Sequence, residues 1–179
     1  MRARSCTIDS SCVIALDHLN LIPQLSLLFS IVLVPKAVRE DLFKRRTTKD
    51  RIQNLFEDFA FFQRCDGYEQ GTVAFLLPER VREGAQDRAE VEAVVQASEL
   101  GAIVIVDDPW GRQLAASDEL EFHGTVWVLQ RFHELGLLSS GTLREYFESL
   151  DTRGIRLPWD IVNSFLEEIG EKPVERWSN

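Results

Sequence analysis

Short apolar runs alternate with longer amphipathic segments along the first part of the chain. Residues 7–9 look like the end of a strand, and residues 10–11 offer an N-cap for the apolar helix that follows. A continuous β-branched run at residues 31–34 predicts a second strand, and Pro35 suits the first turn of a helix that runs to about residue 45. The order is therefore strand, helix, strand, helix.

The pattern weakens at residues 43–84 and becomes clear again after them. In the weak segment we expect a helix at about 51–61, and loop at 66–72 and at Pro78. A helix at 87–100 ends at Gly101, and the apolar run at 102–106 is typical of a parallel strand covered on both faces. Further helices are expected at 110–117, 125–135 and 142–150, and from Pro158 onward. This alternation predicts an α/β fold with a central, mostly parallel sheet.

Composition narrows the class of protein. The 179 residues, 45% of them hydrophobic, fit one ordinary globular domain, which buries about 70% of its unfolded surface. The formal net charge is −9, which argues against a protein that holds nucleic acid mainly through a basic surface. It does not exclude a nucleic-acid enzyme, because bound divalent cations would supply positive charge among gathered acids.

Cysteines and apolar stretches give the expected compartment. The three cysteines show none of the spacings of a zinc site or a redox motif, so we expect reduced, buried thiols. Asp9 interrupts any signal-peptide core, and the longest apolar stretch, at 25–34, is too short to span a bilayer. We expect a soluble, cytoplasmic protein that makes no membrane contact.

Two predicted strands end on a carboxylate, Asp9 and Asp107. In open α/β sheets ligands bind outside the carboxyl ends of the strands, which makes both acids candidates for a site. Each also has a plain structural alternative. Asp9 could cap the helix that follows it, and Asp107 could be a loop acid that accepts bonds from nearby backbone amides.

Two helices add one inward-facing acid each. On a wheel of about 100° per residue, Glu90 lies inside the apolar stripe of its helix and Asp41 inside that of the helix after Pro35. Glu40 falls on the polar side beside Lys44, and Glu92 falls on the outer face, where we expect a solvated acid. Burying an unpaired carboxylate is costly, so the inward acids need a partner.

A hard divalent cation would satisfy all four acids together. No arginine or histidine is spaced to neutralise Asp9, Asp41, Glu90 and Asp107, whereas Mg²⁺ or Mn²⁺ prefers oxygen ligands of this kind. The three histidines have no metal-ligand spacing and are expected at the surface or in packing.

At this point the chain resembles the PIN-domain family, in the branch close to VapC-type toxin ribonucleases. The motifs that carry the resemblance cover most of the chain, except for about residues 44–84. It comprises Ile8-Asp9-Ser10-Ser11, Val34-Pro35 through Asp41-Leu42, Ala89-Glu90-Val91-Glu92-Ala93, Val106-Asp107-Asp108 with Gly111-Arg112, His123-Gly124-Thr125, Gly136, Gly154 through Leu157, and Gly170-Glu171.

The resemblance implies a fold and an activity. It implies a single three-layer α/β/α domain over 1–179, with a variable segment at about 44–84 and C-terminal helices at about 142–170. It also implies a metal-dependent endoribonuclease whose Asp9, Asp41, Glu90 and Asp107 bind Mg²⁺ or Mn²⁺ and cleave RNA. A toxin of this kind would pair with an antitoxin protein, and the C-terminal helix with Trp159 is a candidate surface for that partner or for a homodimer.

Several assignments stay open at this stage. The family position of Asp41 is usually Glu, so Glu40 is the alternative ligand if the register is off by one. Ser10 is a possible accessory residue, and Asp108 is either an acid behind the metal ligands or a helix cap. For Arg112 we favour a structural salt bridge over orienting an acid or contacting phosphate. A basic cluster either guides nucleic acid or is a solvated helix end: Lys44, Arg45, Arg46, Lys49 and Arg51.

Two other functions compete with the nuclease. The fold could be a catalytically weak nucleic-acid or protein binding module. Alternatively, Asp9 could accept a phosphoryl group, but such domains place a second acid two residues later, where this chain has Ser11.

Overall fold

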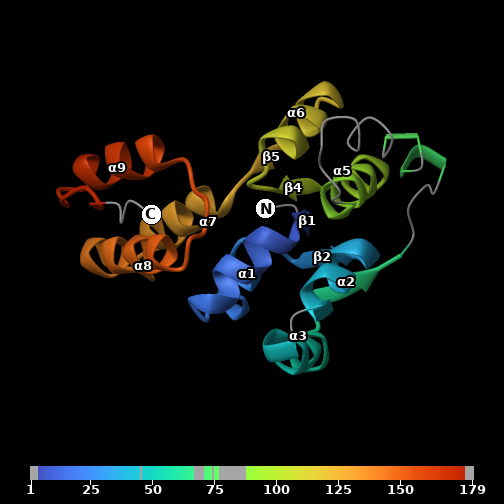
Figure 1. The fold of residues 1–179 in the computed structure, drawn as a ribbon, viewed down its shortest axis with the longest axis horizontal. Helices are drawn as coiled ribbons and strands as arrows, with labels where there is room; N and C mark the ends of the chain where they lie inside the picture. The colour runs from blue at the N-terminus through green and yellow to red at the C-terminus, as the bar shows by residue number, and fades with distance from the viewer. Residues whose placement is uncertain (1–3, 45, 67–70, 74, 77–87, 176–179) are drawn as a thin grey trace. The chain divides into compact units, whose positions relative to one another are not determined.

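The computed structural model describes residues 4–44, 46–66, 71–73, 75–76 and 88–175. The chain forms two compact units, Met1–His123 and Gly124–Asn179. The first unit contains the sheet and the second is helical (Figure 1).

The first unit is built on a five-stranded sheet in the order β3-β2-β1-β4-β5, in which all neighbouring strands are parallel. Apolar side chains fill its three central strands, as expected of strands covered on both faces. The strands are β1 (Ser5–Ile8), β2 (Ile31–Pro35), β3 (Phe62–Cys65), β4 (Ile103–Ile105) and β5 (Phe122–His123).

Helices connect these strands. Pro35 closes β2, and α2 begins at the next residue, so the turn from strand to helix is tight. Gly101 ends α5 in the left-handed conformation that glycine adopts without strain. The helical elements of this unit are α1 (Ser10–His18), a 3₁₀ turn η1 (Pro23–Leu27), α2 (Lys36–Lys44), α3 (Arg46–Asp58), α5 (Ala89–Leu100) and α6 (Pro109–Ser117).

The two faces of the sheet have different helical cover. On one face Val104 and Val106 pack against α5 and against Ala115 of α6, and Thr7 Oγ1 donates to the Ala93 carbonyl at 2.8 Å. Alternation along the strands points Ile8 to the opposite face. The right-handed crossover from β1 to β2 brings α1 to that face. The unit is therefore the three-layer α/β/α arrangement that the sequence predicts.

The second unit consists of α7 (Thr125–Glu134), α8 (Ser140–Thr152) and α9 (Trp159–Glu168). Helix α8 packs against both α7 and α9. Ser139 caps α8, since its hydroxyl accepts from the Thr142 amide at 3.1 Å. Apolar side chains from all three helices are fully buried, namely Val128, Leu129, Phe132, Leu143, Phe147, Leu150, Val162 and Leu166.

Most predicted elements are present, and two strands are additional. The helix expected at 51–61 lies at 46–58, and the segment after it forms β3, a strand that the sequence does not predict. Strand β5 has only two residues. Both missed strands are short edge strands that pair on one side only, so their sequences carry neither a long apolar run nor a clear alternation.

The predicted loop at 66–72 falls partly on residues that the structure describes. Residues 71–73 are helical, so its last two positions are not loop, while 67–70 and Pro78 lie outside the described residues. Among the helices that the structure describes, none combines the length and apolar character needed to cross a bilayer.

Candidate active site

Asp9 and Asp107 follow neighbouring parallel strands at the same edge of the sheet. Ile8 of β1 is in register with Ile105 of β4, and the Asp9 amide donates to the Ile105 carbonyl at 2.9 Å. Asp107 comes two residues after the end of β4. The structure therefore brings both strand-end acids to the carboxyl edge, as the sequence predicts for a ligand site.

The Asp9 carboxylate is held by hydroxyl groups. Asp9 occupies the N-cap position of α1, which the sequence suggested for residues 10–11, yet its side chain makes no capping hydrogen bond. The side chain is 1% exposed, with Ser10 Oγ donating to Oδ1 at 3.2 Å and Ser11 Oγ donating to Oδ2. Asp9 is thus the N-cap residue of α1 by position, as the alternative proposed, but its carboxylate bonds to two serine hydroxyls and not to the backbone amides of the helix.

A thiol connects α1 to Asp107. Cys12 is fully buried on α1, and its Sγ donates to Asp107 Oδ2 at 3.3 Å. Cys12 lies three residues after Asp9, within the first turn of the same helix. Because the thiol and Asp9 belong to one rigid turn, this contact fixes Asp107 relative to Asp9.

Glu90 is buried where α5, α6 and the end of β4 meet. It lies in the first turn of α5 and is 6% exposed. A Cβ on Gly111 of α6 would be 2.8 Å from Val106 Cγ2 and 3.3 Å from Glu90 Cβ. Glycine therefore lets α6 approach both residues, which places the base of the Glu90 side chain beside the end of β4.

We expect Gly111→Ala to destabilise the protein and to weaken any activity that depends on Glu90. The added methyl group meets a buried valine that has no room to move, and such overpacking costs about 1 to 3 kcal/mol, partly offset by the better helix propensity of alanine. Thermal melting measures the change. Gly141→Ala in α8 is the matched control, because a Cβ there would meet only Glu171 Oε1, at 3.9 Å. Equal melting temperatures for the two variants would contradict the close approach.

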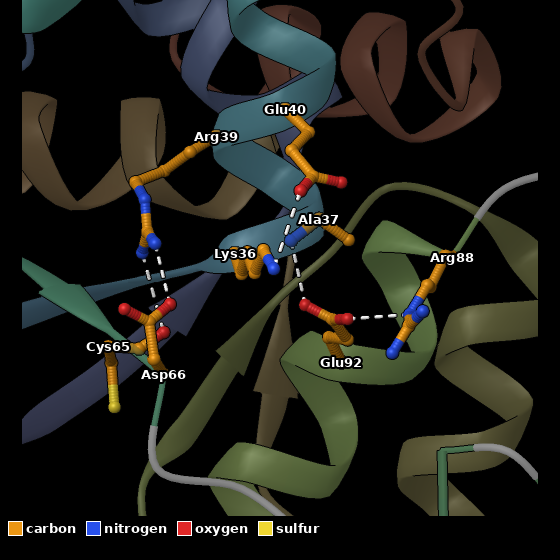
Figure 2. A network of polar contacts seen from close by, with 8 residues as sticks. All are labelled: Lys36, Ala37, Arg39, Glu40, Cys65, Asp66, Arg88 and Glu92. Atoms are coloured by element: carbon orange, nitrogen blue, oxygen red, sulfur yellow. Dashed lines mark hydrogen bonds and ion pairs between the residues drawn. The ribbon is translucent and has the colours of Figure 1, made fainter. Parts of the chain in front are cut away.

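The second acid of α5, Glu92, is buried, so its predicted place on a solvated face is wrong. It is 1% exposed and accepts a hydrogen bond from the Ala37 amide at 2.7 Å through Oε2. Its Oε1 pairs with Arg88 Nε at 2.7 Å. Figure 2 shows the carboxylate between the first turn of α2 and Arg88. Glu92 thus joins α2 to α5, because it accepts a hydrogen bond from a backbone amide that has no partner within the first turn of α2.

A second contact anchors α2 to the sheet (Figure 2). The Arg39 guanidinium donates to the carbonyl of Val34 at 2.8 Å and to that of Cys65 at 3.4 Å. It also pairs with Asp66 Oδ1 at 2.5 Å. Helix α2 is therefore tied to β2 and β3 on one side and to α5 on the other.

The acid pair of α2 divides as the helical wheel predicts. Asp41 has a 21% exposed side chain and pairs with Lys44, one turn later on the same helix. Glu40 has a 60% exposed side chain and lies 3.9 Å from Lys36 Nζ, measured from Oε1. Burial thus favours Asp41 over Glu40 as the inward acid, but a lysine holds its carboxylate.

Asp108 is a helix cap. Its side chain accepts from the Gly111 amide at 2.9 Å and closes the first turn of α6, which settles the alternative left open for it. Arg112 of the same helix forms no ion pair with any described residue, so the structural salt bridge that we favoured is not found among them.

The basic cluster after α2 is partly engaged with acids. Lys44 pairs with Asp41, and Arg51 pairs with Asp17, a buried acid of α1. Lys49 is exposed. Arg45 and the side chain of Arg46 lie outside what the structure describes. Lys44 therefore pairs within α2, and Arg51 connects α3 to α1. A role of the cluster in guiding nucleic acid remains a prediction.

A family model described as a PIN domain matches residues 5–171, which is most of the chain and extends over both units. The chain belongs to the PIN-domain family. PIN domains are generally nucleases that use divalent metal ions. A search of curated proteins gives no match.

The candidate acids have the ligand atoms that a divalent metal ion of a PIN domain requires. Asp9, Glu90 and Asp107 offer carboxylate oxygens, the ligands that Mg²⁺ and Mn²⁺ prefer. The donor set therefore fits the ion in the type of its ligand atoms. The described residues do not, however, include three or more His, Cys, Asp or Glu side chains placed closely enough to hold one ion.

Other titratable residues of this PIN domain have structural partners. His123 Nε2 lies 2.9 Å from Glu121 Oε1, and this hydrogen bond, with the nearby Arg4, lowers the pKa of Glu121 from its usual value. His133 contacts the Leu138 carbonyl at 2.8 Å through Nδ1. None of the three cysteines forms a disulfide, and burial raises the pKa of Cys6 well above its ordinary value. Cys6 and Cys12 are buried as expected, whereas Cys65 is only partly buried.

Proposed function

We propose that this PIN domain is a metal-dependent endoribonuclease whose site is the carboxyl edge of the sheet. The observation that carries the proposal is the position of Asp9 and Asp107, which follow the ends of two neighbouring parallel strands. Glu90, buried beside the end of β4, adds a third acid from α5. Membership of the PIN-domain family supports a nuclease in general. The carboxylate oxygens favour Mg²⁺ or Mn²⁺ as the bound cation.

In this proposal Asp9 and Asp107 hold Mg²⁺ or Mn²⁺ directly, and Asp41 and Glu90 hold it directly or through water. When bound, the ion would polarise the scissile phosphate, lower the pKa of a water molecule and stabilise charge on the leaving oxygen. Ser10 and Ser11 keep the Asp9 carboxylate aimed at the edge. Cys12 does the same for Asp107, and Glu92 holds together the helices that carry Asp41 and Glu90.

We further propose that the substrate is RNA and that the protein acts in the cytoplasm as the toxin of a toxin and antitoxin pair. The protein has an acidic net charge and so does not offer RNA a broad basic surface. Bound metal ions would instead supply the positive charge that RNA contacts at the site. The antitoxin would cover the acidic edge, for which a positively charged segment is the complementary chemistry.

The test is cleavage of a labelled single-stranded RNA by the purified protein in Mn²⁺, in Mg²⁺ and in EDTA. The proposal predicts cutting with either ion and none with EDTA. A labelled single-stranded DNA of the same sequence separates the two substrate classes, because only RNA offers the 2′-hydroxyl. Cutting that persists in EDTA would contradict the proposed chemistry.

A binding module is the second candidate, and one contact favours it. Lys44 neutralises Asp41, so a cation would have to displace this ion pair to use the fourth acid. If the protein retains RNA in a filter-binding assay but shows no cleavage with either ion, the binding module is the better description.

A further inference from the structure

Arg112 lies on the helix that begins at the proposed site. Helix α6 starts two residues after Asp107, and the Arg112 amide donates to the Asp108 carbonyl at 3.0 Å. Its neighbour Gly111 packs against Glu90. The Arg112 backbone therefore lies about one helical turn, or about 5 Å, from the acidic edge.

The guanidinium of Arg112 rests on an aromatic ring. Its Cζ is 5.7 Å from the centroid of Phe122, a residue of β5. Among the described residues it forms no ion pair, and its Nε is buried without a hydrogen-bond acceptor. Six other arginines each pair with a carboxylate, namely Arg4, Arg39, Arg51, Arg88, Arg131 and Arg144.

Among the described arginines, Arg112 is the one with a buried side-chain nitrogen that finds no hydrogen-bond acceptor. Acidic residues outnumber Lys and Arg by 29 to 20, so carboxylates are plentiful. A buried N–H group that finds no acceptor costs free energy. The arrangement holds one positive charge in a fixed place and leaves it for an anion from outside the described chain.

The chemistry of the side chain indicates which anion. Arginine presents a planar fork of donors that matches phosphate oxygens, and it stacks well on aromatic rings. Stacking on Phe122 restricts the side chain before the ligand arrives, which lowers the entropic cost of binding. A phosphodiester backbone offers a phosphate at every nucleotide, so a strand cut at the acidic edge has another phosphate close by.

We propose that Arg112 binds a backbone phosphate of the substrate strand next to the one that is cleaved. This assignment rests on the proposed nuclease function and names the group that holds the strand. It would also help an acidic protein to retain RNA, since Arg112 lies on the helix that begins at the site. Arg112 then contributes to affinity and register and leaves the chemistry to the acids and their metal ion.

The test measures RNA binding and cleavage separately for Arg112→Ala and Arg112→Lys. Fluorescence anisotropy of a labelled single-stranded RNA in EDTA reports binding without cutting, and kinetics in Mn²⁺ give KM and kcat. For Arg112→Ala we expect binding to weaken about tenfold, KM to rise by a similar factor and kcat to stay close to wild type. The slope of log affinity against log salt should fall by about 0.7, which is one phosphate contact on a single strand. Arg112→Lys should keep that slope and lose part of the affinity.

Arg64→Ala is the matched control. The Arg64 guanidinium also lies over a ring, with Cζ 5.1 Å from the Phe56 centroid, but Arg64 belongs to β3 at the opposite edge of the sheet. We expect wild-type affinity, KM and salt slope from this variant, and melting curves check that both variants fold.

The outcomes separate this assignment from the proposed function. Wild-type protein that neither binds nor cleaves RNA overturns both. Wild-type cleavage together with unchanged affinity, KM and salt slope in Arg112→Ala overturns the role of Arg112 alone. Equal losses in Arg112→Ala and Arg64→Ala also overturn it, because a general charge effect would then account for the result.

Discussion

Asp9→Asn is expected to lower the rate of metal-dependent RNA cleavage at least about 100-fold, and Asp107→Asn should do the same. Losing a group that only supports a metal ligand already costs about 10- to 100-fold, so loss of a ligand should cost no less. Asparagine has the size of aspartate. Its oxygen still accepts from one of the two serines, and its amide group can donate to the hydroxyl of the other, so the variant keeps its local packing while losing the charge. The rate of cleavage in Mn²⁺ is the measurement.

Asp118→Asn is the control for these two variants. Asp118 is exposed at the far end of α6, away from the strand edge that holds Asp107. We expect its cleavage rate to match wild type. If Asp9→Asn cut RNA as fast as Asp118→Asn, the carboxyl edge would not be the site.

Glu92→Ala should lower the free energy of unfolding by about 2 to 3 kcal/mol. The variant removes a buried carboxylate that accepts from the Ala37 amide and from Arg88, and hydrogen bonds to charged groups contribute about 1.5 to 3 kcal/mol. The loss stays below that of a fully buried pair, because Arg88 is 44% exposed and regains water. The melting temperature should fall by about 4 to 12 °C for a chain of this size, as measured by circular dichroism.

Two further variants identify the cause of that loss. Glu92→Gln keeps an oxygen for the Ala37 amide but removes the charge, so its melting temperature should lie between those of wild type and Glu92→Ala. Glu99→Ala truncates an exposed acid of the same helix and should change the melting temperature little. A Glu92→Ala protein as stable as Glu99→Ala would show that the contact between α2 and α5 is unimportant.

The positions of the two strand-end acids could be predicted from the sequence, because they depend only on where each strand ends. A β-branched run that ends in Asp107 fixes both the strand and the edge at which the acid lies, and Asp9 follows the same logic. The parallel register of β1 and β4 then brings them to one edge. The wheel likewise gave Glu90 and Asp41, since the inward stripe of each helix depends only on spacing.

The misplaced residues depend on contacts between distant segments. Glu92 faces outward on the wheel of its own helix, but α2 covers that face and offers an unpaired amide. Arg112 was expected to form a structural salt bridge, and the structure places its guanidinium over Phe122. A pattern within one helix carries no information on which neighbour covers it, and this is why the prediction for Glu92 failed.

The most direct test of a metal centre at the carboxyl edge is a calorimetric titration of the purified protein with Mn²⁺. The account predicts saturable binding at or below millimolar concentration to the wild type. It predicts no such binding to a variant that combines Asp9→Asn with Asp107→Asn and retains a wild-type circular dichroism spectrum. Absence of binding to the wild type, or undiminished binding to the double variant, would contradict the central claim.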